Sequence, residues 1–512
     1  MTPALGAALA ELPVKLAAHV TLSAAALGLA IVVATPLVLL PRTRPGARWA
    51  VLAAAGLIQT IPALALLALF YPALLAVRGV TGGTLPVLGF LPALLALTLY
   101  ALLPLLRGGL NGLMGVDRDV VEAANGVGMT PRQRLLQVEL PLAAPVIMAG
   151  VRTAAVWTIG AATLATAVGA ACLGDFIFSG LQTENWVAVL VGCAGAAALA
   201  VAVDALLGLV ESGLGTGSRF KMFAGAAGLM LIGGLAIVPQ LGSAAPGKPI
   251  VVGAKNFSEQ YILADVITAR LAPRAVVERT GLGSAVAFRA LAGGDIDTYV
   301  DYAGTLWTGI LGHNEKLPRA ELLARLSREL HAKYGVGVVG PLGFENAYVL
   351  AVRRDLATRL HLVSIADLAR AAPGLTLGAD IEFLSRPEWA GLRDAYGLTF
   401  KAHKSFEPTF MYRALASGEA DVISAFSSDG RIAAQDLVVL TDPKGAIPAY
   451  DALLLVSPAR AKDGSLDAAL RPLVGSIGVE AMRRANLLVD RESDKLSPAA
   501  AAKTLLTGET KK

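Results

Sequence analysis

The chain has 512 residues, of which 55% are apolar and only 16% are charged, whereas an ordinary soluble domain has about 25% charged residues. This composition excludes a purely soluble protein and a disordered chain, and two cysteines are too few for a disulfide-rich secreted scaffold. The charge is also uneven, because residues 1–245 hold only 12 of the 44 basic and 9 of the 39 acidic residues. The first half therefore has the composition of a membrane protein and the second half that of a soluble domain. A net charge of +5 without any Lys/Arg-rich run gives no indication of nucleic-acid binding.

Six apolar segments in the first half are long enough to cross a membrane. A transmembrane helix needs roughly 20 mainly apolar residues, and helix is the expected form because lipid cannot satisfy exposed backbone groups. The segments without charged residues are 16–41, 49–77, 79–106, 153–174, 185–203 and 222–247. We therefore expect an α-helical membrane domain with about six transmembrane helices.

The basic residues between these segments predict the orientation. They are Arg42, Arg44 and Arg48 after the first segment, Arg107, Arg118, Arg132 and Arg134 after the third, and Arg219 and Lys221 after the fifth. Loops rich in Lys and Arg stay in the cytoplasm. We therefore expect a multi-pass protein of the bacterial inner (cytoplasmic) membrane, in contact with membrane lipid, whose C-terminal domain is extracytoplasmic (periplasmic).

The sixth segment allows two interpretations. Arg219-Phe-Lys221, the apolar stretch after it and Gly242-Ser-Ala-Ala-Pro246 together have the form of a secretory signal joined in frame to a membrane protein. Cleavage would release the second half, whereas an uncleaved segment would tether it to the membrane. We expect the uncleaved tether, because release would discard the benefit of joining the two halves.

The long loop between the third and fourth segments, residues 117–141, carries a motif. It contains Glu122-Ala-Ala-Asn-Gly-Val-Gly128, followed by Thr130-Pro-Arg-Gln-Arg134 and Val138-Glu-Leu-Pro141. Small side chains at the start of a helix allow another protein to approach closely. Gly128 can end or bend that helix, and Thr130 with Pro131 is a typical start of a second one.

This pattern resembles the EAA loop of ABC-importer permeases. The resemblance implies that a separate ABC ATPase subunit binds the loop, through the residues Glu122, Ala123, Ala124, Gly128, Leu140 and Pro141. No GxxxxGK[ST] sequence occurs in the chain, so we expect ATP hydrolysis by a separate chain and no enzymatic activity in this one. One permease set per chain predicts a homodimer around a two-fold axis.

The second half alternates strand and helix patterns from residue 249 onward. Strands are predicted at 250–254, 275–280, 298–300, 375–378 and 422–425, and helices at 259–271, 285–292 and 409–416. This alternation predicts an α/β domain with mainly parallel sheets. The segment is large enough for two lobes with a site in the crevice between them.

Several blocks of the second half resemble the binding proteins for glycine betaine, carnitine, choline and ergothioneine. The first is Gly253-Ala-Lys-Asn-Phe-Ser-Glu-Gln260, and five further blocks follow in the same order as in that family. They are 294–305 (GDIDTYVDYAGT), 341–348 (PLGFENAY), 378–386 (GADIEFLSR), 421–431 (DVISAFSSDGR) and 448–451 (PAYD). The resemblance implies a two-lobed, type II periplasmic-binding-protein-like fold, and it extends to the first half as a type I ABC importer permease-like domain.

The resemblance also implies which residues bind the ligand. A quaternary ammonium has no N–H to donate, so aromatic faces suit it, and the family pattern implies a cage at Tyr302, Tyr348, Phe426 and Tyr450. Asn346 stands at an acceptor position that is often Asp in relatives. A carboxylate at the other end of the ligand would be held by Lys255, Thr305 and Arg386, of which Arg offers a bidentate fork.

These patterns predict three parts of the chain. Residues 1–221 form a permease domain with five transmembrane helices, and residues 222–245 form the sixth helix and a tether. Residues 246–512 form a substrate-binding domain, with one lobe at 246–346 and 452–512 and the other at 347–451. Together they predict ABC-type import of a quaternary-ammonium zwitterion, without a cofactor, a metal site or a nucleic-acid partner.

Three alternatives remain at this point. The first is an importer of a choline-type cation, a ligand that has the quaternary ammonium but no carboxylate. A membrane-anchored ligand sensor would not need the EAA-like loop, and the chain contains no cytoplasmic output domain. An enzyme acting on betaines would need a nucleophile–base pair, a metal cluster or a cofactor loop, and none is recognisable in the sequence.

Overall fold

The computed structural model describes residues 3–41, 44–81, 85–183, 185–241, 249–313, 315, 317–491 and 494–507. The chain divides into two compact units, of which one contains residues 8–177 and 188–244 and the other contains residues 245–512 together with 1–7 and 178–187. Each unit is described separately below.

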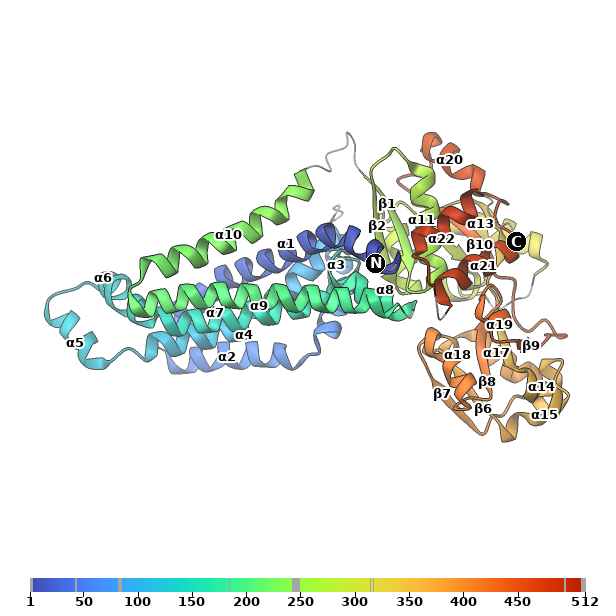
Figure 1. Cartoon of the computed structure of the whole chain (residues 1–512), viewed down its shortest axis with the longest axis horizontal. Helices are drawn as coiled ribbons and strands as arrows, with labels where there is room; N and C mark the ends of the chain where they lie inside the picture. The colour runs from blue at the N-terminus through green and yellow to red at the C-terminus, as the bar shows by residue number, and fades with distance from the viewer. Residues whose placement is uncertain are drawn as a thin grey trace. The chain divides into compact units, whose positions relative to one another are not determined.

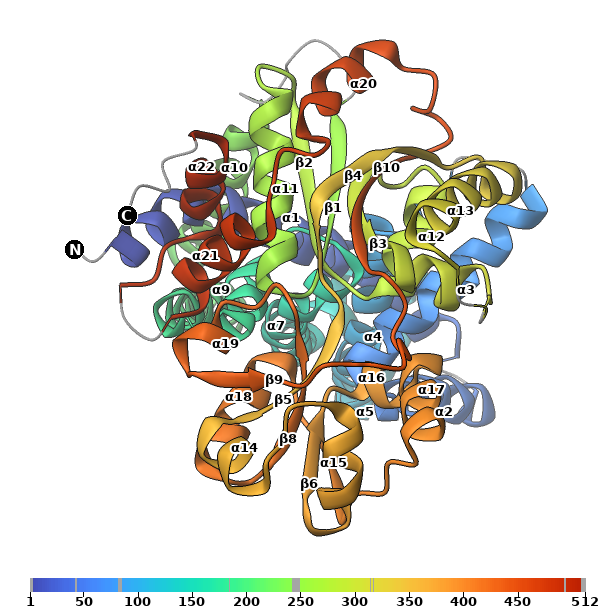
Figure 2. The same ribbon diagram turned by 90° about the vertical axis from the view of Figure 1, so that its right-hand side faces the viewer.

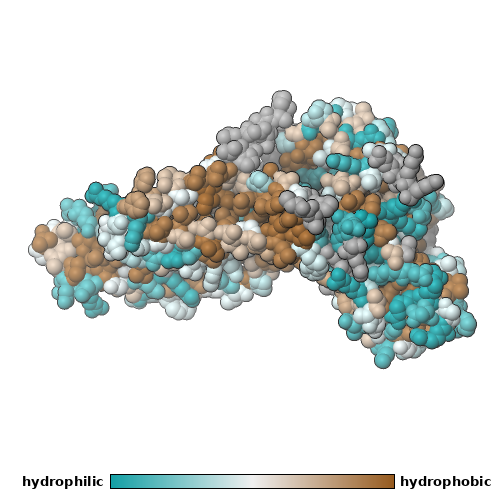
Figure 3. Space-filling view, viewed as in Figure 1, coloured by the Kyte–Doolittle hydropathy of each residue, from teal (hydrophilic) through white to brown (hydrophobic). Residues whose placement is uncertain are grey.

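The first unit is a bundle of long helices (Figure 1). Its elements are α1 (Pro3–Leu39), α2 (Pro45–Thr60), α3 (Ala63–Thr81), α4 (Phe90–Met114), α5 (Arg118–Gly126), α6 (Pro131–Arg134), the π-turn η2 (Leu135–Glu139), α7 (Leu140–Ala162), the 3-10 turn η3 (Thr163–Val168), α8 (Gly174–Gln182), α9 (Trp186–Thr216) and α10 (Arg219–Leu241). The visible side of the bundle is mostly apolar, whereas the α/β unit carries many hydrophilic residues (Figure 3).

Six helical stretches of the described residues are long and apolar enough to cross a membrane. They are Ala8–Leu39, Ala63–Thr81, Phe90–Met114, Pro131–Val168, Trp186–Thr216 and Arg219–Ile237. The expectation of about six apolar helices is therefore confirmed. The end of the predicted tether, residues 242–245, lies outside the described residues.

The second predicted segment is not one helix. The sequence pattern predicts a continuous span over 49–77, but α2 ends at Thr60 and α3 begins at Ala63. Ile61 is extended, with φ −73° and ψ 126°, because Pro62 lacks an N–H and disfavours helix at the residue before it. Ala55 in α2 packs beside the second half of α4, and Leu66 in α3 packs beside its first half.

The fourth and fifth spans are longer than their charge-free runs. Span four includes Arg152, and span five includes Asp204 and Glu211. Arg152 donates to both Asp204 carboxylate oxygens at 3.0 and 2.8 Å and to Glu211 at 2.7 Å. Charges inside a membrane helix are tolerated when they pair, so a search for uncharged runs starts span four too late and ends span five too early.

Helices α4 and α7 pack closely where two glycines meet. A Cβ atom on Gly108 would lie only 2.8 Å from the Cα of Gly150, so neither position has room for a larger residue. Small residues allow membrane helices to approach each other in this way. Helix α4 is also the most buried of the six candidate spans.

The second unit is an α/β domain. Its strands are β1 (Ile250–Lys255), β2 (Val276–Leu282), β3 (Thr298–Tyr302), β4 (Gly337–Glu345), β5 (Tyr348–Arg353), β6 (Thr376–Ala379), β7 (Ala402–Ser405), β8 (Val422–Phe426), β9 (Leu437–Val439) and β10 (Asp451–Val456). Its helices are α11 (Ser258–Leu271), α12 (Ser284–Ala292), η4 (Thr305–Ile310), α13 (Arg319–Tyr334), α14 (Arg354–Leu360), α15 (Ile365–Ala371), η5 (Ala372–Gly374), α16 (Ile381–Ser385), α17 (Pro387–Tyr396), α18 (Pro408–Ser417), α19 (Arg431–Ala434), α20 (Gly464–Leu470), η6 (Arg471–Leu473), α21 (Val479–Asp490) and α22 (Pro498–Thr507). All eight elements predicted above are present, with ends shifted by one or two residues.

The strands form two five-stranded sheets, in the orders β2-β1-β3-β10-β4 and β7-β6-β8-β5-β9. Figure 2 shows strands of the first sheet in one lobe and strands of the second sheet in the other. Strands β1, β2 and β3 pair in parallel, as do β6, β7 and β8. The pairs that involve β10 and β5 are antiparallel. The expectation of mainly parallel sheets is therefore only half correct, because in each sheet a strand that enters from the other lobe runs against its neighbours.

The chain passes between the sheets at two neighbouring connections. One joins β4 to β5 and contains Asn346, and the other leads from β9 to β10 and contains Tyr450. The Asn346 N–H donates to the Tyr450 carbonyl oxygen at 3.0 Å, so the two connections are hydrogen-bonded to each other. This pairing fixes two predicted site residues at the boundary between the lobes.

Candidate functional site

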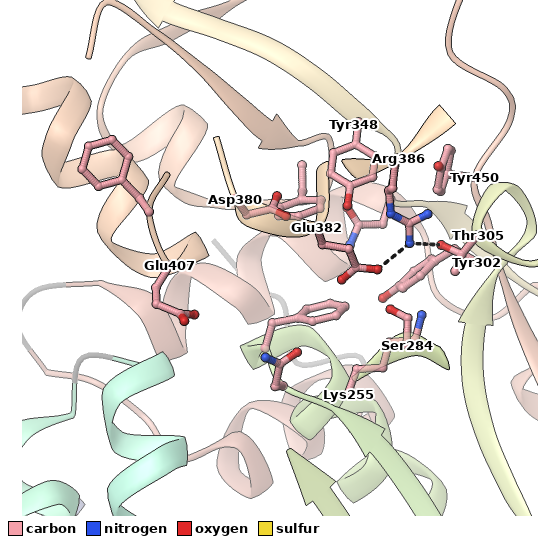
Figure 4. Close-up of a pocket in the computed structure, with 15 residues that line it drawn as sticks. Lys255, Ser284, Tyr302, Thr305, Tyr348, Asp380, Glu382, Arg386, Glu407 and Tyr450 are labelled. Carbon is pink, nitrogen blue, oxygen red and sulfur yellow. Dashed lines mark hydrogen bonds and ion pairs between the residues drawn. The ribbon is translucent and has the colours of Figure 1, made fainter. Parts of the chain in front are cut away.

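A cavity of about 320 Å³ lies between the two sheets of the α/β unit (Figure 4). Its walls come from the ends of β1, β3 and β8, the starts of α12 and β5, the connections between the sheets, and the segments around α16 and after β7. All eight residues predicted to bind a ligand line this cavity: Lys255, Tyr302, Thr305, Asn346, Tyr348, Arg386, Phe426 and Tyr450. The sequence blocks therefore converge on one place, although they lie as far as 195 positions apart in the chain.

Aromatic rings form one part of the wall. Tyr348 and Phe426 are directly opposite each other in the pairing of β5 with β8, and their ring centroids are 5.0 Å apart. The ring of Tyr450 lies 5.8 Å from that of Tyr348 and is nearly perpendicular to it. Phe257 lies 6.2 Å from both Tyr302 and Phe426. Phe257 was not among the predicted residues, although it stands inside the block 253–260.

Arg386 lies among acidic and polar groups (Figure 4). Its guanidinium donates to Glu382 at 2.7 Å and to the Thr305 hydroxyl at 3.4 Å, and it is 3.5 Å from Glu388. Burial alone would lower the pKa of Arg386, but Glu382 and Glu388 among other neighbours raise it above its ordinary value. Its Nε–H is buried and has no hydrogen-bond partner among the described residues, so one donor of the fork remains available.

Lys255 has a different environment from the one expected. Its ammonium forms a buried ion pair with Asp301 and lies 5.2 Å from the centroid of the Tyr302 ring. Asp301 also accepts hydrogen bonds from the Tyr299 hydroxyl and from the Tyr302 N–H. A ligand carboxylate at Lys255 would therefore meet a positive charge that Asp301 already balances.

Acidic residues that were not predicted from the sequence also line the cavity. They are Asp380, Glu382 and Glu407. One oxygen of Asp380 accepts from the Phe383 N–H at 2.7 Å as a helix cap, and the other is buried without a partner in the described chain. Burial raises the pKa of Asp380 to about 6. Asp380 and Glu382 stand in the block 378–386, so their position in that block was the available signal.

The predicted loop 117–141 forms two short helices at one end of the bundle (Figure 1). Asp117 caps α5 by accepting from the Asp119 N–H at 2.9 Å. Glu122 and Ala123 are exposed, whereas Ala124 is buried. Gly128 has a φ of +81°, a conformation that favours glycine, and it follows the end of α5 as expected.

The second helix of the loop starts with the predicted cap. Thr130 and Gln133 form a reciprocal capping box, with Pro131 in the first turn. Arg134 joins the two helices, because it donates to Asn125 at 2.7 Å and pairs with the buried Glu139 at 2.7 Å. Leu140 and Pro141 then begin α7. The exposed residues Val127 and Leu136 leave apolar surface at this end of the bundle.

A bundle of apolar membrane-spanning helices and a two-lobed domain with a cavity between its sheets define a class of protein: a membrane permease joined in one chain to a substrate receptor. Comparisons with known proteins agree. Residues 23–216 match the binding-protein-dependent transport system inner membrane component. Residues 248–507 match the substrate binding domain of ABC-type glycine betaine transport systems.

One relative has both halves in a single chain, and others match one half. The ergothioneine transport permease/ergothioneine binding protein EgtU of Helicobacter pylori is 31% identical over 430 residues, which are 80% of this chain and 74% of the relative. The choline transport system permease protein OpuBB of Bacillus subtilis is 42% identical over 202 residues, which are 39% of this chain and 87% of the relative. A solved structure, of a glycine betaine/carnitine/choline ABC transporter, is 27% identical with a TM-score of 0.45 and covers 51% of this chain and 98% of its own.

The chain belongs to the family of ABC importers for glycine betaine, choline, carnitine and ergothioneine. It is a fused permease and substrate-binding protein, embedded in a membrane by its N-terminal helices. It is a transporter subunit and not an enzyme, in agreement with its relatives.

Proposed function

We propose that this chain imports a quaternary-ammonium zwitterion of the glycine betaine, carnitine or ergothioneine class. The proposal is based on the composition of one cavity wall, in which aromatic rings lie beside Arg386. Aromatic faces attract a cation that cannot donate a hydrogen bond, and the guanidinium fork suits a carboxylate. A zwitterion has both groups, so it would use both parts of the wall.

The cationic end of the ligand would lie against Tyr302, Tyr348, Phe426 and Tyr450, with Phe257 as a fifth ring. The centroid distances of 5.0 to 6.2 Å between neighbouring rings leave them as separate faces of one wall. Asn346, whose Oδ1 is buried without a partner in the described chain, is the acceptor for an N–H or O–H on the ligand.

The carboxylate would be held by Arg386 and Thr305, which are already in contact at 3.4 Å. Lys255 would contribute less than a free ammonium, because Asp301 balances its charge. Binding of the carboxylate would compete with Glu382 for the same guanidinium, as in other sites where a ligand replaces an internal partner.

Choline is the second candidate, and one observation favours it. Asp380, Glu382 and Glu407 place three carboxyl groups on the cavity wall, which suits a ligand with a positive charge and no carboxylate. The unused Nε–H of Arg386 favours the zwitterion, because a cation cannot accept it.

The permease half would couple transport to a separate ABC ATPase subunit through Glu122, Ala123, Ala124, Gly128, Leu140 and Pro141. Exposed apolar residues beside this set, Val127 and Leu136, support a docking role. A membrane-anchored sensor would not require this loop.

We propose the domain boundaries 1–221, 222–245 and 246–512, two copies per importer, and an extracytoplasmic second half.

A binding panel on the full chain in lipid nanodiscs tests the ligand class. Glycine betaine, carnitine, ergothioneine and choline are titrated separately by calorimetry. Saturable binding of at least one zwitterion, tighter than that of choline, is expected. Binding of choline alone would replace the zwitterion with the second candidate, and binding of none of the four would reject the proposed function.

A further inference from the structure

Two tyrosines of the aromatic wall donate their hydroxyl groups to buried carboxylates. Tyr302 donates to Glu259 at 2.5 Å, and Tyr450 donates to Glu388. Each carboxylate lies at the hydroxyl end of its ring, and neither glutamate is among the residues that line the main cavity. The ligand can therefore meet the ring faces without touching either carboxylate.

The two carboxylates differ in how their charge is balanced. Glu388 is 3.5 Å from the Arg386 guanidinium and also accepts from the Thr308 hydroxyl at 2.7 Å. A basic side chain is therefore already next to Glu388. The negative charge beside Tyr450 is in large part compensated within the protein.

Glu259 is surrounded by uncharged donors. One carboxylate oxygen accepts from the Tyr302 hydroxyl and from the Asn346 amide at 3.1 Å, and the other accepts from the Ser428 hydroxyl at 2.5 Å and the Asn486 amide at 2.9 Å. Its side chain is 3% exposed. The Tyr302 hydroxyl accepts from Gln260 at 3.0 Å, so its own proton points to Glu259.

The basic groups near this carboxylate have other partners. Lys255, above the Tyr302 ring, is paired with Asp301. A small cavity of about 30 Å³ beside Glu259 is lined by one basic residue, Arg431. Arg431 is 2.7 Å from Asp429 and 3.9 Å from Asp490. Glu259 is therefore the carboxylate beside Tyr302 that no basic side chain of the described residues balances by an ion pair.

A phenol that donates to a carboxylate becomes richer in electrons, and the attraction of a ring for a cation grows with the negative potential of its face. The carboxylate itself also attracts a cation through the buried medium, where charges are weakly screened. Because Glu259 does not line the main cavity, it can act on charge without adding a contact.

We propose that Glu259 is the buried counter-ion for the quaternary ammonium and acts through the hydroxyl and ring of Tyr302. In this role Glu259 determines the preference of the pocket for a cation over an uncharged group of the same shape. This inference rests on the proposed function, since it presupposes that a quaternary ammonium binds at the aromatic wall. Glu259 is a positioning residue in this scheme, because it touches Tyr302 and not the ligand.

The test compares ligands that differ only in charge. Glycine betaine is paired with 3,3-dimethylbutanoate, and choline with 3,3-dimethylbutan-1-ol, because each second compound has a carbon atom in place of the ammonium nitrogen. Equilibrium binding to the full chain in nanodiscs at pH 8 gives the affinity ratio of each pair. A purely structural role would weaken both members of a pair equally and leave this ratio unchanged.

Three variants decide between charge and structure. Glu259→Gln should lower the cation-to-neutral ratio about tenfold or more, and Tyr302→Phe, which keeps the ring but breaks the hydrogen bond, should lower it by a smaller factor. Ser428→Ala is the matched control, because it removes another hydrogen bond to the same carboxylate without touching the ring. It should keep the wild-type ratio.

Each result has a defined consequence. If the wild type prefers the charged member and both Glu259→Gln and Tyr302→Phe keep that preference, the inference is wrong and the proposed function stands. If Ser428→Ala lowers the affinity ratio as much as Glu259→Gln does, a general structural effect explains the change and the counter-ion role is rejected. If Glu259→Gln does not fold, the ratio in Tyr302→Phe decides alone. If the wild type binds none of the betaine-class ligands or choline, the proposed function fails together with the inference.

Discussion

Replacing Arg386 separates recognition of the ligand carboxylate from recognition of its cation. Arg386→Gln removes the positive charge and keeps a side chain of intermediate length. A hydrogen bond to a charged group typically contributes about 1.5–3 kcal/mol, which corresponds to roughly a 10- to 150-fold change in affinity. The Arg386 guanidinium also contacts Glu382 and Glu388, so part of its charge is already used. We therefore expect a loss near the lower limit, about tenfold, for glycine betaine.

The matched variant is Glu382→Gln. Glu382 is 2.7 Å from Arg386, and its side chain is 48% exposed. Because solvent reaches Glu382 and screens the pair, the pair contributes about 1 kcal/mol, so releasing Arg386 should strengthen glycine betaine binding by up to about fivefold. The two neutralising variants thus change the affinity in opposite directions.

Calorimetry of the wild type and both variants, each with glycine betaine and with choline, is the assay. Choline has no carboxylate, so Arg386→Gln should not weaken its binding. Equal losses for both ligands would mean that Arg386 holds the lobes together and does not bind the carboxylate. No loss for either ligand would remove the main support for a zwitterion.

Three further predictions follow from other parts of the chain. Because burial raises the pKa of Asp380 to about 6, the folded state holds a proton between pH 4 and 6 that the unfolded state releases. Deprotonation of Asp380 therefore destabilises the folded state by nothing below pH 4 and by about 3 kcal/mol at pH 7.5. Asp380→Asn should raise the melting temperature at pH 7.5 but not at pH 4, and equal shifts of the melting temperature at both pH values would contradict this prediction. Gly128→Trp should abolish uptake while ligand binding persists. The φ of +81° at this position favours glycine, and a bulky side chain would lie on the exposed face of the loop. Normal ATP-driven uptake in proteoliposomes would refute the docking role. A reporter that is active only in the cytoplasm, fused after Lys512, should give no signal, and a strong signal would reverse the proposed orientation.

The sequence alone determined the architecture and most of the wall of the cavity. Apolar runs predict membrane helices because lipid demands satisfied backbone groups, and the cap at Thr130 is set by residues three positions apart. Tyr348 and Phe426 stand inside recognisable blocks, and the pairing of β5 with β8 brings them together. These features depend on local periodicity or on short motifs, which can be seen in one sequence.

Only the tertiary structure determined which charges meet. Lys255 pairs with Asp301, 46 positions away, and Tyr450 donates to Glu388, 62 positions away. Arg152 of one membrane helix forms an ion pair with Asp204 of another, although a search for uncharged segments excludes both residues from their spans. The partner of a buried charge depends on packing between distant elements, and neither hydrophobic periodicity nor motif spacing contains that information. The sequence therefore determines which chemical groups the pocket has, and the packing determines which of their charges remain available to a ligand.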